Sequence, residues 1–194
     1  MERASSSSSP DAFGLLGLPE RFDLDPAVIE QAFFDKSKDL HADRFASAPA
    51  AERVAALSRS RALNDAYQVV KKPVARAEYL LARAGVTIGD NERVEPELLM
   101  EVLELREELA EAKGAGKVAV ASVGSADERG DAQRRAATIE ALRANMAGRR
   151  DAAVGALAQL FERADLAAIK KQLILLRYLD RYLEECDAAL DAED

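Results

Sequence analysis

The sequence is poor in the residues that most often carry catalysis or bind metals. Its 194 residues include one cysteine (Cys186), one histidine (His41) and no tryptophan, and aromatic residues make up only 5%. One cysteine forms no internal disulfide and supplies no four-ligand metal site by itself. One histidine leaves little acid–base chemistry, and the sequence has neither a glycine-rich phosphate loop nor a nucleophile elbow. We therefore expect a non-enzymatic protein with no catalytic residue, no metal ion and no cofactor.

The sequence also lacks excess positive charge and long apolar runs, and both absences concern possible partners. The formal net charge is −8, so the chain lacks the basic excess that nucleic-acid binding needs to displace counterions from phosphates. No apolar run approaches the roughly 20 residues that span a bilayer, and residues 1–10 contain no apolar signal core. We expect no nucleic acid and no membrane as partner, and a cytoplasmic location, which the single cysteine also fits. Residues 1–10, with five consecutive serines, are expected to form a disordered leader.

What the sequence has in abundance is alanine, leucine, glutamate and arginine, which favour helix over strand. Over residues 11–86 the apolar residues recur at helical spacing. Asp25 and Pro26 are an N-cap and a first-turn proline, and they open a helix that runs to about Leu40. The next helix carries a buried face at spacing 0, 3, 4 and 7, formed by Leu63, Ala66, Tyr67 and Val70. A shorter helix follows Pro73. We predict one compact helical unit over residues 11–86.

Residues 87–194 predict a three-helix bundle. Pro96 opens the first helix, the second begins at about Asp131, and the third begins at about Leu166. Between the first two lies Gly114–Gly130, which contains four glycines and is expected to be a flexible insertion. Gly148 and Gly155 weaken the second helix and suggest a bend there. No strand pattern stands out, so the predicted fold class is all-α.

The first bundle helix concentrates the negative charge of the chain. Residues 90–112 carry nine acidic and two basic residues. One apolar stripe accounts for a core-facing side: Leu98, Val102, Leu105 and Leu109. Three apolar residues are then surplus, and three glutamates flank them: Leu99, Met100 and Leu103, with Glu104, Glu107 and Glu111. An apolar patch rimmed by charge is typical of a partner-binding face. The alternative is a wide core stripe beside an ordinary solvated acidic face.

The loop His41-Ala42-Asp43-Arg44-Phe45, between two helices, resembles the J domain, in which a His-Pro-Asp loop stimulates the ATPase of a partner chaperone. The wider chain resembles the iron–sulfur co-chaperone family HscB from Ala12 to about Leu190. The segments that carry this resemblance are Phe13–Pro19, Pro73–Leu81, Leu99–Leu109 and Leu176–Arg181. It implies a J domain over residues 11–86 and a scaffold-binding three-helix domain over residues 87–194. The implied partners are a DnaK/HscA-type chaperone ATPase and an iron–sulfur cluster scaffold protein.

The same resemblance implies roles for individual residues. His41 and Asp43 match the outer positions of the J loop, and Lys36, Lys38 and Arg44 are candidate contacts to an acidic surface of the chaperone. Asp35 and Asp39 offer an alternative, because as neighbours they could simply neutralise these cations. Implied scaffold-binding positions are Leu99, Met100, Leu103, Glu104, Glu107, Glu111 and, on the last helix, Tyr178.

Ala42 is a departure from the family, because it replaces the proline of the J loop. Alanine removes the fixed φ that stiffens this loop, at an ordering cost on the order of 1 kcal/mol. Two hypotheses therefore stand. The first is a co-chaperone that binds the scaffold and stimulates the chaperone ATPase. The second is a helical adaptor that binds scaffold or chaperone without stimulating ATP hydrolysis.

Overall fold

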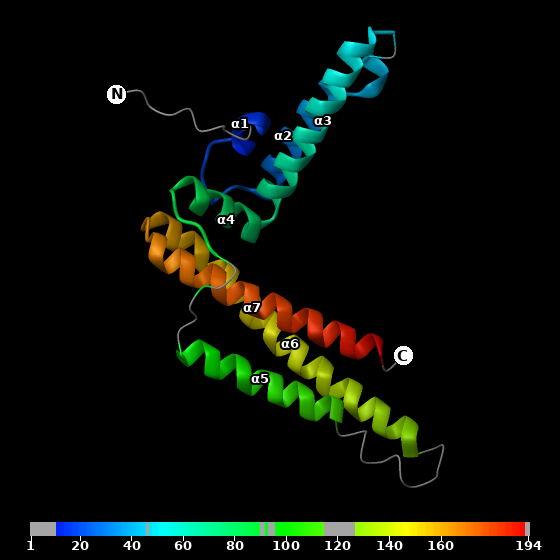
Figure 1. Cartoon of the computed structure of the whole chain (residues 1–194), viewed down its shortest axis with the longest axis vertical. Coiled ribbons are helices and arrows are strands. Elements are labelled where there is room, and N and C mark those ends of the chain that lie inside the picture. Colours follow the sequence, from blue (N-terminus) through cyan, green and yellow to red (C-terminus); the bar gives the residue numbers. More distant parts are fainter. Residues whose placement is uncertain (1–10, 46, 90–91, 93–95, 115–126, 193–194) are drawn as a thin grey trace. The chain divides into compact units, whose positions relative to one another are not determined.

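The computed structural model describes residues 11–45, 47–89, 92, 96–114 and 127–192. These residues form helices and connecting turns with no strand among them, so the all-α prediction is confirmed (Figure 1). They fall into two compact units, residues 1–87 and 88–194. The expected leader, residues 1–10, lies outside the described part of the chain. No helix over the described residues is both long enough and apolar enough to cross a bilayer.

The described residues of unit 1 form four α-helices and one 3-10 turn. They are α1 (Ala12–Leu16), α2 (Pro26–Asp39), η1 (Ala42–Phe45), α3 (Ala50–Lys71) and α4 (Pro73–Arg83). The Asp25 side chain caps α2 by accepting a hydrogen bond of 2.8 Å from the backbone N–H of Ala27, and Pro26 takes the first helical position. Gly17 ends α1 at φ 73°, a left-handed conformation that glycine adopts without steric cost.

Helices α2 and α3 lie side by side and form the hairpin of unit 1 (Figure 1). Its core is built from α1, α2 and α3 and contains Phe13, Leu16, Ile29, Leu63 and Val70, together with Ala12, Leu24 and Ala66. The predicted buried face of α3 is confirmed, with Tyr67 only half-buried at its edge. The Tyr67 ring stacks on the Phe33 ring of α2 with centroids 4.1 Å apart, which locks the two helices together.

The short helix α1 packs mainly on α3 and is also tied to α4 through Tyr79. The Tyr79 hydroxyl accepts a hydrogen bond of 3.0 Å from the backbone N–H of Ala12 and lies 3.3 Å from Asp11 Oδ1, to which it donates. The Phe13 side chain is buried, with its ring 5.8 Å from that of Tyr79. Five residues are too few for a stable isolated helix, so α1 depends on these tertiary contacts.

Unit 2 contains three helices, α5 (Pro96–Gly114), α6 (Asp127–Glu162) and α7 (Leu166–Asp191). Helices α6 and α7 pack along each other, and α5 lies against both (Figure 1). The most completely buried side chains of this unit are Leu109, Ile139, Leu157, Ile169, Leu173, Leu176 and Cys186. Asp165 caps α7, because its side chain accepts a hydrogen bond of 3.0 Å from the backbone N–H of Ala168.

The predicted insertion at Gly114–Gly130 is wrong at both ends. Gly114 is the last residue of α5, and α6 begins at Asp127 instead of about Asp131, so residues 127–130 are helical. Residues 115–126 lie outside the described part of the chain. Gly148 and Gly155 do not interrupt α6, which is one continuous helix. Each glycine costs a helix up to about 1 kcal/mol, and the burial of Ile139, Met146 and Leu157 offsets that cost.

Candidate functional site

The turn at the end of the α2–α3 hairpin carries the first candidate site. His41 is exposed and follows Leu40, the C-terminal cap of α2. Ala42 and Asp43 are the first two residues of η1, and the backbone N–H of Arg44 donates to the His41 carbonyl at 3.0 Å. The turn is therefore helical with alanine in its first position. A proline is tolerated at that position, since the first N–H groups of a helical turn have no partner within it.

The basic residues beside this turn are largely paired with their neighbours. Lys38 lies 3.2 Å from Asp35, with its ammonium group 4.2 Å from the centre of the Phe34 ring, and Arg44 lies 2.6 Å from Asp39. The alternative in which these aspartates neutralise the cations therefore holds for Lys38 and Arg44. A hydrogen bond from Gln31, and then one from Lys38, hold the pKa of Asp35 below its usual value. Pairs as exposed as these are screened by water and contribute little to stability.

A groove that the sequence analysis missed lies beside His41. It is a cavity of about 490 Å³ between α2, η1 and α3, and its apolar lining residues are Phe34, Leu40, Phe45, Ala56 and Leu57. Phe34 and Leu57 are 56% and 55% exposed, which is high for large apolar side chains. The only signal in the sequence was that Phe34 and Leu57 fall off the apolar stripes of their helices.

The outer face of α5 carries the second candidate site. Leu99, Met100 and Leu103 are 46%, 58% and 46% exposed, so the expected exposure of these surplus apolar residues is found. With the exposed Glu104, Glu107 and Glu111 they form what we call the α5 patch. At about 100° per residue the patch spans roughly 140° of the helix, and it lies opposite the buried Leu109 and Ala112. The alternative of a wide core stripe is therefore wrong for these three residues.

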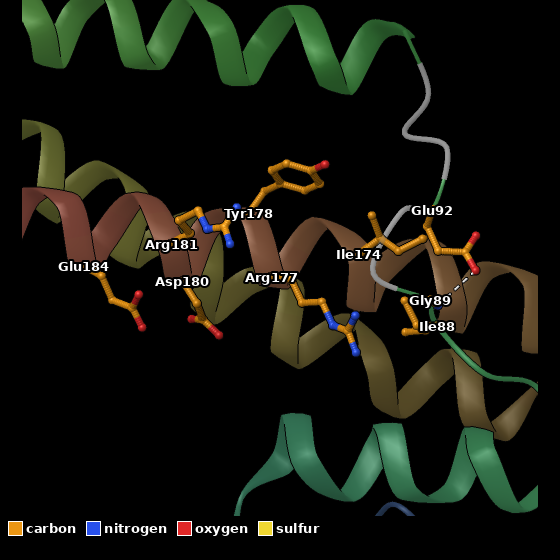
Figure 2. A pocket seen from close by; sticks show the side chains of 9 residues that line it. All are labelled: Ile88, Gly89, Glu92, Ile174, Arg177, Tyr178, Asp180, Arg181 and Glu184. Atoms are coloured by element: carbon orange, nitrogen blue, oxygen red, sulfur yellow. Dashed lines mark hydrogen bonds between the residues drawn. The ribbon is translucent and has the colours of Figure 1, made fainter.

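Tyr178 lies on α7, apart from the α5 patch in the sequence but in the same unit. It is half-buried and lines a cavity of about 540 Å³, and Figure 2 shows its ring pointing toward the side of α7 on which α5 lies. The other lining residues come from α7 and from the segment before α5, so the α5 patch itself does not line this cavity. An ion pair of 2.9 Å between Arg106 and Glu185 joins α5 to α7.

Charged residues of both signs line the same cavity as Tyr178. Figure 2 shows Arg181 beside Tyr178, whereas Arg177 and Asp180 point to the other side of α7. Asp180 forms an ion pair with Arg150 of α6. Glu92 accepts hydrogen bonds from Lys170 at 2.7 Å and from the backbone N–H of Gly89 at 3.2 Å. The Lys170 contact, followed by that of Gly89, lowers the pKa of Glu92, which therefore stays ionised. This surface presents an aromatic ring among fixed charges of both signs.

Cys186 is a core residue. Its thiol is buried, and burial raises its pKa, so it stays in the unreactive thiol form. Its neighbour Tyr182 is 4% exposed, and the Tyr182 hydroxyl has no hydrogen-bond partner among the described residues. Within that same part of the chain, no three His, Cys, Asp or Glu side chains are grouped as metal ligands.

These features define a class of fold: a two-unit helical protein with a short 3-10 turn at the end of its first hairpin. Residues 126–187 match the family described as the HSCB C-terminal oligomerisation domain. Co-chaperone protein HscB homologs of Vibrio vulnificus and an Azoarcus species are 44% identical over 101 residues and 40% identical over 110 residues. These alignments cover 51% and 56% of this chain. They cover 59% and 62% of the relatives, so the chain spans about three fifths of the length of the curated relatives it matches.

The likeness in structure extends further along the chain. Chaperone HscB from Vibrio cholerae superimposes with a TM-score of 0.73 at 28% identity, covering 94% of this chain and 98% of that one. Human co-chaperone protein HscB gives the same TM-score at 20% identity, covering 96% and 83%, which is a likeness of fold. The chain is similar to HscB co-chaperones in sequence and in fold, and the resemblance drawn from its motifs is confirmed.

Proposed function

We propose that this protein is a co-chaperone of iron–sulfur cluster biogenesis that connects a cluster scaffold protein to a DnaK/HscA-type chaperone ATPase. Its similarity to the HscB co-chaperones supports the general role. The observation that carries the bridging proposal is that the two candidate surfaces lie on different units. The J-type turn is on unit 1, and the α5 patch is on unit 2. One chain can then hold two partners at once without competition for a common surface.

In this proposal the α5 patch and Tyr178 bind the scaffold. The apolar centre of the patch supplies affinity through burial, and its glutamates select a partner with basic residues and speed the encounter. The scaffold is the partner that carries the cluster, since the described residues of this chain offer only one buried thiol.

The hairpin turn engages the chaperone in its ATP-bound state. His41 is exposed, and Asp43 lies two residues further on in the same turn. Lys36, Lys38 and Arg44 add exposed cations. Lys38 and Arg44 exchange their present aspartates for carboxylates of the chaperone. Hydrolysis then closes the chaperone on the scaffold, which favours transfer of the cluster. The protein itself performs no chemistry in this scheme.

The test is the steady-state ATPase rate of the organism's own DnaK/HscA-type chaperone with the scaffold present. We expect the natural chain to raise the rate and Asp43→Asn to abolish the increase. Asn keeps the size of Asp but removes its charge. Asp65→Asn, an exposed α3 position remote from the turn in sequence, is the matched control and should stimulate like the natural chain. If Asp43→Asn stimulates fully, the chaperone-stimulating role is wrong.

The second candidate function is an adaptor that binds both partners but leaves the ATPase rate unchanged. Ala42 favours it, because the chain lacks the proline that would fix φ in this turn. Ala42→Pro separates the two candidates, since the first position of η1 accepts proline. Rescue of stimulation by Ala42→Pro, with none from the natural chain, would establish the adaptor. Equal stimulation by both chains would exclude it.

A further inference from the structure

Helix α5 is buried against the rest of unit 2 near one end only. Of the α5 residues whose side chains are described, Leu109 and Ala112 are buried, and both lie in the last two turns. No described side chain from Pro96 to Glu108 is buried. Helices α6 and α7 pack along each other more extensively, and the end of their pair that includes the start of α7 has buried apolar side chains of its own: Leu157, Ile169, Leu173 and Leu176.

We propose that α5 undocks from the α6–α7 pair as one unit while that pair stays folded, and that a scaffold bound to the α5 patch holds α5 docked. The first part depends on the structure of unit 2 alone. The second part rests on the proposed function, because it takes the scaffold as the partner. The α5 patch then lies on a helix that has two states, docked and undocked.

The side of α7 that α5 covers follows from the ion pairs of α7. Glu185 pairs with Arg106 of α5 at 2.9 Å. Asp180 pairs with Arg150 of α6. At about 100° per residue, Tyr182 lies roughly 60° around α7 from Glu185 and roughly 160° from Asp180. The buried Tyr182 side chain therefore faces α5.

Cys186 lies about one turn after Tyr182, where the three helices of unit 2 meet. It is roughly 100° around α7 from Glu185, which faces α5, and roughly 100° from Asp187, which pairs with α6. Lys113 of α5 lies near enough to act on the Cys186 thiol electrostatically. Cys186 is fully buried, so departure of α5 removes one of the helices that cover it.

The contacts that hold α5 are few, and one of them is unfavourable. The side chains of Arg106 and Glu185 are 45% and 36% exposed, so water and salt screen their attraction. The Tyr182 hydroxyl is buried without a hydrogen-bond partner among the described residues, and undocking returns it to water. Burial of Leu109 and Ala112 is then the main attachment. An element with so few buried contacts opens at a lower free energy than the whole unit unfolds.

A scaffold that contacts two helices of unit 2 favours the docked state. In the proposed function it binds the α5 patch together with Tyr178 of α7, whose ring points toward the side of α7 on which α5 lies (Figure 2). A partner that needs both helices binds the docked state more tightly than the undocked one, so it shifts the equilibrium toward docking. The undocked fraction correspondingly lowers the apparent affinity of the chain for the scaffold.

The accessibility of Cys186 measures undocking in the full chain. Cys186 is the only cysteine of the sequence, so N-ethylmaleimide adds to one thiol, and the mass of the chain reports the reaction. We expect labelling of the natural chain in native buffer to be at least about tenfold faster than its unfolding equilibrium in urea allows. Labelling no faster than global unfolding permits would overturn undocking.

Two matched variants separate undocking from global unfolding. Leu109→Ala removes the main attachment of α5 and should speed labelling about thirtyfold or more. Leu157→Ala is the control, because Leu157 is equally buried but lies on α6 beyond Ala153, whose carbonyl accepts a hydrogen bond from Gln172 near the start of α7. It should change the labelling rate by less than about threefold although it weakens the unit toward urea. Equal acceleration by both variants would contradict the proposal.

Hydrogen exchange of the natural chain covers the case in which Leu109→Ala fails to fold. Most of the stability of a helix in a protein comes from tertiary packing, so α5 loses its amide protection when it undocks. Amides of α5 should exchange at least about tenfold faster than those of residues 169–176 of α7. Equal protection of these two segments would also overturn undocking.

The scaffold part of the proposal has its own measurement. Saturating scaffold should slow labelling of Cys186 at least about tenfold, and the chain with Leu99→Ala, Met100→Ala and Leu103→Ala should gain no such protection at the same concentration. If the scaffold binds and labelling of the natural chain is unchanged, the clamping is wrong while undocking and scaffold binding stand. If the scaffold does not bind, the proposed function fails, and undocking is still decided by the chain alone.

Discussion

Removal of the apolar part of the α5 patch should weaken scaffold binding strongly. Leu99, Met100 and Leu103 are each about half exposed. Full burial of such a side chain is worth about 1.5–3 kcal/mol, so covering the exposed halves of all three gives roughly 2–4 kcal/mol. We therefore expect the triple alanine variant to bind the scaffold roughly 30- to 1,000-fold more weakly. Isothermal titration calorimetry with the organism's own scaffold protein measures this directly.

The structure makes this perturbation easy to interpret. Alanine is the best helix former, and the three side chains lie opposite the buried Leu109 and Ala112, so α5 keeps both its helix and its core contacts. Val28→Ala is the matched control, because Val28 is also half exposed but lies on unit 1. Its affinity should match that of the natural chain. A change of less than about threefold in the triple variant would refute the assignment of the patch, since the buried-area argument cannot yield so little.

Three further predictions follow from other parts of the molecule. Replacing the three glutamates of the α5 patch by glutamine should slow association with the scaffold and flatten its salt dependence in stopped-flow measurements; an unchanged salt dependence would contradict the charge argument. Gly148→Ala should raise the free energy of unfolding in urea by about 0.5–1 kcal/mol, because its new Cβ meets open space. Gly85→Ala should lower the free energy of unfolding by about 1–2 kcal/mol, because φ 83° is a left-handed conformation that strains alanine. Burial raises the pKa of Tyr182 to about 12, so the folded state holds this proton more tightly than the unfolded state. The free energy of unfolding should therefore fall as pH rises from about 10 to 12, and Tyr182→Phe should reduce that fall; an identical pH dependence in the variant would show that other groups cause it.

Helical periodicity predicted the elements well because most helices here have one buried side. The stripe Leu63, Ala66 and Val70 is buried, and so are Ile169, Leu173 and Leu176 on α7. The same periodicity predicts the α5 patch, because apolar residues that do not belong to the core-facing stripe of a helix lie on its exposed side. Local sequence was sufficient in these places because each helix packs mainly through one face.

Periodicity did not predict burial where a helix packs against two neighbours, and it did not predict the helix boundary where the helix-propensity cost of a glycine is offset. Tyr182 and Cys186 are buried although they lie off the stripe that Ile169, Leu173 and Leu176 form, because α7 contacts both α5 and α6. The predicted start of α6 is four residues too late, because the low helix propensity of Gly130 indicated a loop where the structure has a helix.

The groove beside His41 was beyond sequence analysis for a different reason. Phe34 and Leu57 are 23 residues apart in the printed sequence, and each alone is an unremarked apolar residue off a helical stripe. Only the pairing of α2 with α3 brings them to one concave surface. The pairing of Lys38 with Asp35 and of Arg44 with Asp39 is an alternative that the sequence does indicate, since i, i+3 neighbours and residues around a tight turn are close in any such hairpin.

The hydrogen bond between Ala12 and Tyr79 has a consequence for how unit 1 folds during synthesis. It joins residues 67 positions apart, and it ties the first helix of the unit to the last one. As the chain leaves the ribosome, α1 emerges first. Its hydrogen-bond partner Tyr79 follows only when nearly the whole unit has been synthesised. A nascent chain that stops before Tyr79 can already pack Phe13 and Leu16 against α2 and α3, but it lacks the hydrogen bond to Tyr79 that fixes the start of α1. The start of α1 should therefore gain its full protection only late in synthesis.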